Sequence, residues 1–443
     1  MPSSFPVTDR SDRPEGPTVM LEKAPASDPD SVGSGAADPS ARRSGPGNPT
    51  PPSRKRFGWL RRRRHPVVRA LQVLALVVLI FIGIIGYSVG GALTRPGNDS
   101  VSQRVAEWAR DHHLGGIVTW LEKVQYSQNK PTTGGTVKIP TVHGDKNADG
   151  RPSADPAIPH SATPETPVLL AGQGLPNEGK WQTVVLNKGL PAIQLAYVRP
   201  DAVHTSYYAA LMWMDPKLLT GRLHEGIPSG DPGGVWTTPP QITPELAKTV
   251  AAAFPGGFRV NNGQVGNRGG YYDGRVAGPP APALRTGAAS LVIYQDGTAT
   301  VGQWGRDVSL TANVKSVRQN LDLLVDGGNV NPTCSSDSSP IWGYTVGNDA
   351  YVPRTALGVR KDGSLIFVNS PAVSVCSLGQ LLKSAGVQRG MELDINYDWS
   401  IGYYFTHDGG QVQGHVSRPT QSKGPDHYFS PQSRDFVAFY LRP

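Results

Sequence analysis

Residues 354–368 read RTALGVRKDGSLIFV, in which two runs of strand-forming residues flank the pair Asp362-Gly363. An Asp-Gly pair tolerates the positive φ angles of a tight turn, so this pattern predicts an antiparallel hairpin. Asp296-Gly297 lies in the same way between the runs 290–294 and 298–304, and Asp273-Gly274 is a third pair of this kind. The chain is therefore expected to contain antiparallel sheet.

Two helices are expected beside these strands. Thr243-Pro244-Glu245 provides an N-cap, a proline at the first helical position and an acid in the first turn of a helix that continues over residues 246–254. Ser377 can cap a second helix over residues 378–385. We expect an α+β fold with a mixed, largely antiparallel sheet and flanking helices, in a domain that covers residues 167–443.

The segment Met391-Glu392-Leu393-Asp394-Ile395-Asn396 alternates strictly between apolar and polar residues. This is the period of a strand, so Glu392, Asp394 and Asn396 are expected to share one face. Two carboxylates on one face can work as a general acid/base pair or can bind a hard cation such as Ca²⁺. They can also face solvent without a function, and the pattern alone leaves all three readings open.

Basic residues are concentrated in one short stretch. The chain has 43 Lys+Arg against 35 Asp+Glu, a formal net charge of +8. Residues 51–69 contain eight basic and no acidic side chains, whereas residues 70–443 contain 30 basic and 28 acidic ones. The main part of the chain is nearly neutral, which argues against nucleic acid as its partner.

The basic stretch precedes a candidate membrane span. Residues 1–53 lack hydrophobic periodicity and are expected to form a disordered cytoplasmic tail, followed by a basic juxtamembrane segment at 54–69. Residues 70–94 would form a helix of about 37 Å, enough to cross a hydrocarbon core of about 30 Å. The positive-inside rule then predicts a single-pass cell-membrane protein with a cytoplasmic N-terminus, although a cleaved signal peptide is the alternative.

Two further segments separate this span from the main domain. Residues 95–127 are expected to form an extracytoplasmic helical stalk, and residues 128–166, rich in Pro, Gly and Thr, a flexible linker. Cys334 and Cys376 are the two cysteines of the chain. Outside the membrane they would meet oxidising conditions, which favours a disulfide between them over two free thiols.

Three motifs follow one another in the second half of the chain. They are residues 260–264, the strand Arg354–Val359 with its Asp362-Gly363 turn, and the segment 378–386 that leads into Glu392-Leu393-Asp394. In this order they resemble the phosphodiester glycosidase family, whose best-known member uncovers mannose 6-phosphate by removing N-acetylglucosamine. That family continues with a glycine triplet and a serine where this chain reads Ile395–Ser400, so the resemblance implies a divergent, bacterial branch with an altered site.

The resemblance also implies roles for individual residues. Asp394 would be the catalytic carboxylate, and Glu392 its partner or a ligand of Ca²⁺. Arg354 would hold either a phosphate or a carboxylate of the site. The other residues expected to bind substrate are Asn261, Asn262, Gly263, Arg285, Asn396 and Asp398.

The function that the resemblance implies is hydrolysis of a sugar phosphodiester in a cell-envelope glycan or exopolysaccharide. The enzyme would be anchored in the bilayer through residues 70–94 and would act outside the cytoplasm. Because the glycine triplet is absent, the alternative is an inactive module of the same fold that binds an envelope glycan or has a structural role.

Overall fold

The computed structural model describes residues 66–443, apart from positions 96, 98, 129–130, 143, 146–156, 229, 232–233, 235, 237, 261–268, 275–281, 336–338, 344 and 346–349. The predicted tail at 1–53 and nearly all of the basic segment therefore lie outside the described residues.

An eight-stranded sheet is the largest element of the fold, and every pairing recorded within it is antiparallel. The hairpin predicted around Asp362-Gly363 is confirmed, because β12 and β13 pair from Val359↔Leu365 outward. In spatial order the strands are β1 (Gln182–Asn187), β2 (Leu190–Val198), β3 (Ala209–Met214), β13 (Leu365–Val373), β12 (Val352–Arg360), β14 (Val387–Ile395), β10 (Leu323–Asp326) and β11 (Asn329–Val330).

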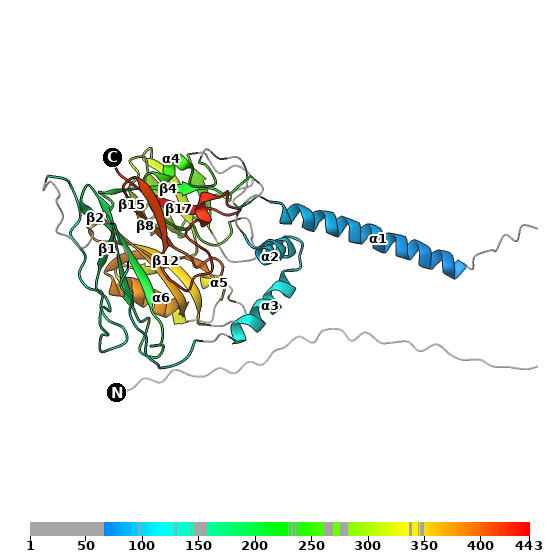
Figure 1. Cartoon of the computed structure of the whole chain (residues 1–443), viewed down its shortest axis with the longest axis horizontal. Coiled ribbons are helices and arrows are strands. Elements are labelled where there is room, and N and C mark those ends of the chain that lie inside the picture. The colour runs from blue at the N-terminus through cyan, green and yellow to red at the C-terminus, as the bar shows by residue number, and fades with distance from the viewer. Residues whose placement is uncertain are drawn as a thin grey trace, which may run out of the picture. The chain divides into compact units, whose positions relative to one another are not determined.

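Two smaller antiparallel sheets complete the β-structure (Figure 1). The hairpin predicted at Asp296-Gly297 is confirmed as β7–β8, whereas the chain beyond Gly274 lies partly outside the described residues. The five-stranded sheet runs β16 (Gln411–Val416), β15 (Tyr403–Asp408), β5 (Val250–Pro255), β17 (Phe436–Leu441), β4 (Leu219–His224), and the four-stranded sheet runs β6 (Tyr271–Asp273), β9 (Val314–Gln319), β7 (Ala289–Tyr294), β8 (Ala299–Gln303).

Apolar side chains fill the space between the sheets and under one helix. The largest core cluster joins residues of all three sheets, among them Leu357, Met391 and Leu393 of the eight-stranded sheet. A second cluster lies on the other face of that sheet, where α6 (Val375–Ser384) buries its leucines against β12, β13 and β14. Both faces of β14 are therefore buried. The α+β fold with largely antiparallel sheet is confirmed.

The structure corrects the two helices expected from the sequence. The first, α4, is only Pro244–Ala247, and the chain from Val250 to Pro255 is the strand β5. An apolar run such as residues 250–254 fits a buried helix or a buried strand equally well, and pairing with β15 and β17 decides for the strand. The second helix, α6, begins three residues earlier than expected, because Ser374 rather than Ser377 caps it.

Three helices precede the sheets. They are α1 (Pro66–Leu93), α2 (Val101–Asp111) and α3 (Gly115–Gln128), with short helical turns later at η1 (Pro332–Ser335), α5 (Ser339–Trp342) and η3 (His427–Phe429). Of the described helices, α1 is long and apolar enough to cross a membrane, with a mean hydropathy of 2.7 in its most apolar window and none of that window buried.

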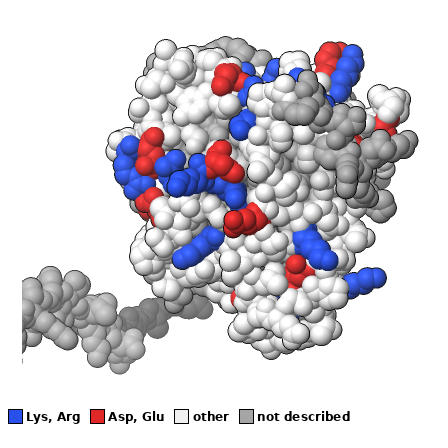
Figure 2. Space-filling view, turned by 90° about the vertical axis from the view of Figure 1, so that its left-hand side faces the viewer, with Lys and Arg blue, Asp and Glu red and all other residues white. Residues whose placement is uncertain are grey.

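Charges of both signs are mixed on the face of the molecule in Figure 2, where lysines and arginines lie beside aspartates and glutamates. No broad basic field covers that face. The picture agrees with the near balance of charge that the sequence gives for residues 70–443.

A disulfide joins Cys334 in η1 to Cys376 in α6, which are 42 residues apart. Replacing both cysteines with serine is expected to lower the free energy of unfolding by about 2–4 kcal/mol, because the unfolded chain regains the freedom of a large loop. Chemical denaturation of the variant, compared with the parent with and without reductant, measures this. Equal stability of the parent in both conditions would contradict it.

Candidate functional site

The strand β14 places both predicted carboxylates, but in a setting that the sequence pattern did not reveal. Met391 and Leu393 face the core between the sheets, as expected from the alternation. A register shift between β12 and β14 interrupts the alternation after Glu392, so Ile395 packs in the second cluster and not with Met391 and Leu393. Glu392 lies opposite Ala356 on the face of the sheet that carries α6, and Glu392 and Asp394 are 0% and 3% exposed. A solvated sheet face is thereby excluded. Each carboxylate needs a partner in a buried environment.

Glu392 is paired with Arg354 of the neighbouring strand β12. The Arg354 Nη1 lies 2.5 Å from Oε1 of Glu392, and its Nε donates to the carbonyl oxygen of Val373 at 3.0 Å. Burial raises the pKa of Glu392, while the Arg354 charge opposes the rise. Of the two roles expected for Arg354, the structure shows the one in which it holds a carboxylate.

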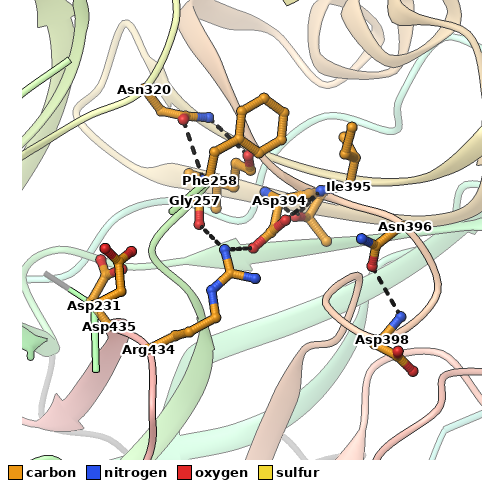
Figure 3. Close-up of polar contacts among 12 residues, drawn as sticks. Asp231, Gly257, Phe258, Asn320, Asp394, Ile395, Asn396, Asp398, Arg434 and Asp435 are labelled. Atoms are coloured by element: carbon orange, nitrogen blue, oxygen red, sulfur yellow. Dashed lines mark hydrogen bonds and ion pairs between the residues drawn. The ribbon is translucent and has the colours of Figure 1, made fainter. Parts of the chain in front are cut away.

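Asp394 is fixed through its main chain and its side chain. The hydroxyl of Thr355 accepts from the Asp394 amide at 3.0 Å and donates to its carbonyl oxygen at 2.9 Å. The side chain accepts from the Ile395 amide at 2.9 Å and forms an ion pair of 2.6 Å with Arg434 (Figure 3). Burial raises the pKa of Asp394 to about 6, although Arg434 acts in the opposite direction.

Arg434 comes from the segment before β17 and reaches Asp394 beside the turn after β5. Its Nη2 also donates to the carbonyl oxygen of Gly257 at 2.9 Å. Asn320 holds that turn against β14, because its side chain accepts from the Phe258 amide and donates to the carbonyl oxygens of Glu392 and Leu393. Figure 3 shows these groups converging on Asp394.

A second ion pair lies next to Arg434 and is completely buried. Arg318 Nε is 2.7 Å from Oδ2 of Asp435, and both side chains are 0% exposed. The guanidinium also donates to the carbonyl oxygen of Phe258. Asp231 lies on the same side and accepts from the Val260 amide at 2.7 Å. This network ties β9, the turn after β5 and the start of β17 together.

Lys423 and Arg434 add positive charge around one aromatic ring. Both cations lie over Trp399, at 3.8 Å and 4.2 Å from its centroid. Lys423 Nζ binds the carboxylate of Asp99 at 2.9 Å, and Ser433 donates to the other oxygen of Asp99 at 3.3 Å. Burial acts to raise the pKa of Asp99, but Lys423 holds it below the ordinary value. The anion that Lys423 binds here is therefore the carboxylate of Asp99 itself.

The loop after Asp394 contains a turn with a backbone conformation typical of glycine, although the residue there is not a glycine. Asn396 has a φ of 76°, in the left-handed region that glycine favours and asparagine tolerates best among other residues. Its side chain accepts from the Asp398 amide at 3.2 Å. The replacement of glycines by Ile395, Asn396 and Tyr397 therefore leaves the reversal of the chain intact, but it adds side chains that glycines lack.

Residues 247–394 match the model of the phosphodiester glycosidase family. The match covers about a third of the chain. The matched segment contains β12, β14 and Asp394, whereas Arg434 and Lys423 follow it in the sequence. No curated protein matches the sequence significantly.

Three solved structures match parts of this chain at low identity and low TM-score. The catalytic domain of zebrafish N-acetylglucosamine-1-phosphodiester alpha-N-acetylglucosaminidase, auto-inhibited by its pro-peptide, is 16% identical, with a TM-score of 0.38 over 71% of this chain and 97% of that one. A hypothetical protein from Synechocystis is 12% identical, with a TM-score of 0.32 over 59% and 64%. An exported protein from Burkholderia pseudomallei is 12% identical, with a TM-score of 0.25 over 53% and 74%.

The other residues predicted to bind substrate have different outcomes. Arg285 pairs with Asp322 at 3.2 Å, and both are about one-third exposed. Asn261, Asn262 and Gly263 lie outside the described residues. Among the described residues there is no group of three acidic, histidine or cysteine side chains that could hold a metal ion, so the Ca²⁺ site expected from Glu392 finds no further ligands there.

The residues that sequence reasoning missed are Arg434, Asp435, Arg318 and Lys423. They lie between 29 and 76 residues from Asp394 along the chain, without motif or periodicity to connect them to it. A signal in the sequence exists for two of them, namely charge next to an apolar run. Arg434-Asp435 directly precedes the fully buried start of β17, where unpaired charges are not tolerated.

Proposed function

We propose that this protein hydrolyses a sugar phosphodiester outside the cytoplasm, in a cell-envelope glycan or exopolysaccharide, while α1 anchors it in the membrane. The observation that carries the proposal is the buried Asp394, which pairs with Arg434 at 2.6 Å and lies in the segment that matches the phosphodiester glycosidase family. A carboxylate beside cations suits a reaction in which a phosphate leaves.

The anchoring is supported by α1 and by the charge before it. The helix Pro66–Leu93 is apolar, and none of its most apolar window is buried. Eight basic residues lie between positions 51 and 69. By the positive-inside rule this charge supports a cytoplasmic N-terminus, with the sheets on the other side.

The proposed reaction needs little general-acid catalysis from the protein. In hydrolysis at C1 of the sugar, water supplies the new C1–O bond, the bond from C1 to the phosphate oxygen breaks, and a phosphate monoester leaves. Such a monoester has a second pKa of about 6 and departs near neutral pH without a proton donor. Asp394 in its ionised form would accept the proton of the attacking water, and Arg434 and Lys423 would bind the leaving phosphate.

This assignment predicts the pH profile of the full-length chain, purified in detergent and supplied with an alkyl phosphodiester of N-acetylglucosamine 1-phosphate. Because burial raises the pKa of Asp394 to about 6, kcat/KM should increase as the pH rises through that value and Asp394 loses its proton. Release of free sugar measures the rate. A rate that falls over the same range would show that the protonated acid is the working form.

A second prediction follows from the contact of Asp99 with Lys423. The Asp99 carboxylate occupies the cation that is proposed to bind the phosphate, so Asp99→Asn should weaken this competition. We expect KM for the phosphodiester to fall roughly tenfold, the equivalent of one charge-assisted hydrogen bond of about 1.4 kcal/mol. Asp307→Asn, which alters an exposed pair with Arg306, is the matched control. An unchanged KM in both variants would remove Lys423 from the phosphate site.

The alternative is a glycan-binding or structural module without turnover. It is favoured by the side chains of Ile395–Tyr397 where the family has glycines, and by the fact that Asp394 and Lys423 are both already paired. Binding of the phosphodiester without release of sugar, unchanged in Asp394→Asn, would support it.

A further inference from the structure

The end of α1 is in direct contact with α2. The indole Nε1 of Trp108 donates to the Ser88 hydroxyl at 2.9 Å, and the imidazole Nε2 of His112 lies 3.1 Å from the same oxygen. The two rings stack with centroids 4.6 Å apart. Ser88 lies five residues before the end of α1, about 7.5 Å along the helix axis. The helix α2 therefore packs beside the last turns of the apolar helix.

A single arginine fixes the corner between these helices. Arg104 of α2 donates to the carbonyl oxygens of Leu93 at 3.0 Å and Asp99 at 2.9 Å, and also to those of Arg95 and Gly97. Carbonyl groups at a helix C-terminus lack partners within the helix and carry partial negative charge. The guanidinium satisfies them, so the corner has a defined geometry.

The next helix exposes an apolar stripe. In α3, Ile117, Trp120, Leu121 and Val124 recur at the spacing i, i+3, i+4, i+7 and are 59%, 62%, 55% and 41% exposed. Residues at this spacing share one face of a helix, whereas Val118, which lies off it, is 7% exposed. Large apolar side chains gathered on one exposed face of a helix mark a contact surface.

We propose that this stripe of α3 is buried in the headgroup region of the outer leaflet of the bilayer. The proposal rests on the membrane anchoring proposed above. Only residues 112–114 separate α3 from α2, and α2 packs against the end of α1, so the stripe starts close to the surface that α1 would cross. Tryptophan and aliphatic residues on one face of a helix are typical of segments that lie in this interface.

Docking of α3 would also hold the candidate site near the lipid. Asp99, which binds Lys423 and Ser433, is only six residues beyond the end of α1, at most about 21 Å of extended chain. Sugar phosphodiesters attached to lipids or to the innermost part of an envelope polymer are then the substrates within reach.

Site-directed spin labels on the full-length chain in lipid nanodiscs test this, with the Cys334–Cys376 disulfide left in place. Labels are introduced in separate variants as Leu121→Cys in the stripe, Ile80→Cys within α1 and Leu310→Cys on the outer domain, where the side chain is 49% exposed. The measured quantity is the ratio of collision rates with oxygen, which concentrates in lipid, and with a water-soluble nickel chelate. We expect the ratio at position 121 to exceed that at position 310 several-fold and to approach that at position 80.

The other outcomes each contradict a different part of the proposal. A high ratio at position 80 with a low one at position 121 leaves the anchoring intact and overturns the docking of α3. A low ratio at position 80 overturns the anchoring and the docking together. Protection of position 121 from both reagents shows a protein segment over the stripe, and dipolar broadening there shows a second copy of the chain, so either result overturns the lipid assignment.

Discussion

Replacing Asp394 with asparagine is expected to lower the hydrolysis of a sugar phosphodiester by a factor of about 10² to 10⁴, the usual contribution of a positioned acid/base group. The amide keeps the shape of the side chain but cannot accept the proton of the attacking water. The main-chain contacts with the Thr355 hydroxyl do not involve the carboxylate and should persist. Single-turnover release of free sugar by the full-length variant gives the rate.

Glu392→Gln is the matched comparison, because it removes a buried carboxylate two residues away on β14. Glu392 is paired with Arg354 and is fully buried, so its replacement should affect stability more than the chemical step. A loss of rate in Asp394→Asn that far exceeds the loss in Glu392→Gln supports the proposed role of Asp394. Similar losses in both variants, or retained turnover in Asp394→Asn, would remove Asp394 from the mechanism.

Replacing Arg318 with alanine is expected to lower the free energy of unfolding by about 3–5 kcal/mol, because it leaves the Asp435 carboxylate buried without its partner. Both side chains of this pair are 0% exposed, and the same guanidinium also binds the carbonyl oxygen of Phe258. The turn that contains Gly257, whose carbonyl oxygen accepts from Arg434, would lose this support. Chemical denaturation of the full-length chain measures the change.

The exposed pair Arg306–Asp326 provides the control, since its side chains are 46% and 45% exposed. Arg306→Ala should cost less than about 1 kcal/mol, as surface ion pairs usually do. The pH adds a second criterion. Burial raises the pKa of Asp435, so the folded Arg318→Ala variant should bind a proton there and recover stability as the pH falls. Equal losses for the two variants, independent of pH, would contradict the assignment.

The sequence predicted those parts of the fold that depend on neighbours along the chain. The turns at Asp296-Gly297 and Asp362-Gly363 follow from backbone preference, and β7–β8 and β12–β13 bear them out. The alternation in residues 391–396 predicted a strand, which is β14, but a register shift against β12 and the turn at Asn396 interrupt the alternation before residue 396. The helix expected over residues 246–254 is wrong. An apolar run has no period that separates helix from strand, so sheet pairing decided it.

The features of the candidate site also divide into those that the sequence predicted and those that only the structure revealed. By itself the sequence determined that Glu392 and Asp394 lie on one strand, that residues 70–94 can cross a membrane and that the basic charge lies before that span. Tertiary structure alone decided that both carboxylates are buried, that Arg354 forms an ion pair with Glu392 and that Arg434 forms an ion pair with Asp394. The physical reason is that a buried charge is tolerated only beside a compensating one. Here that partner comes from another strand or from a segment 40 residues away, where sequence spacing carries no information.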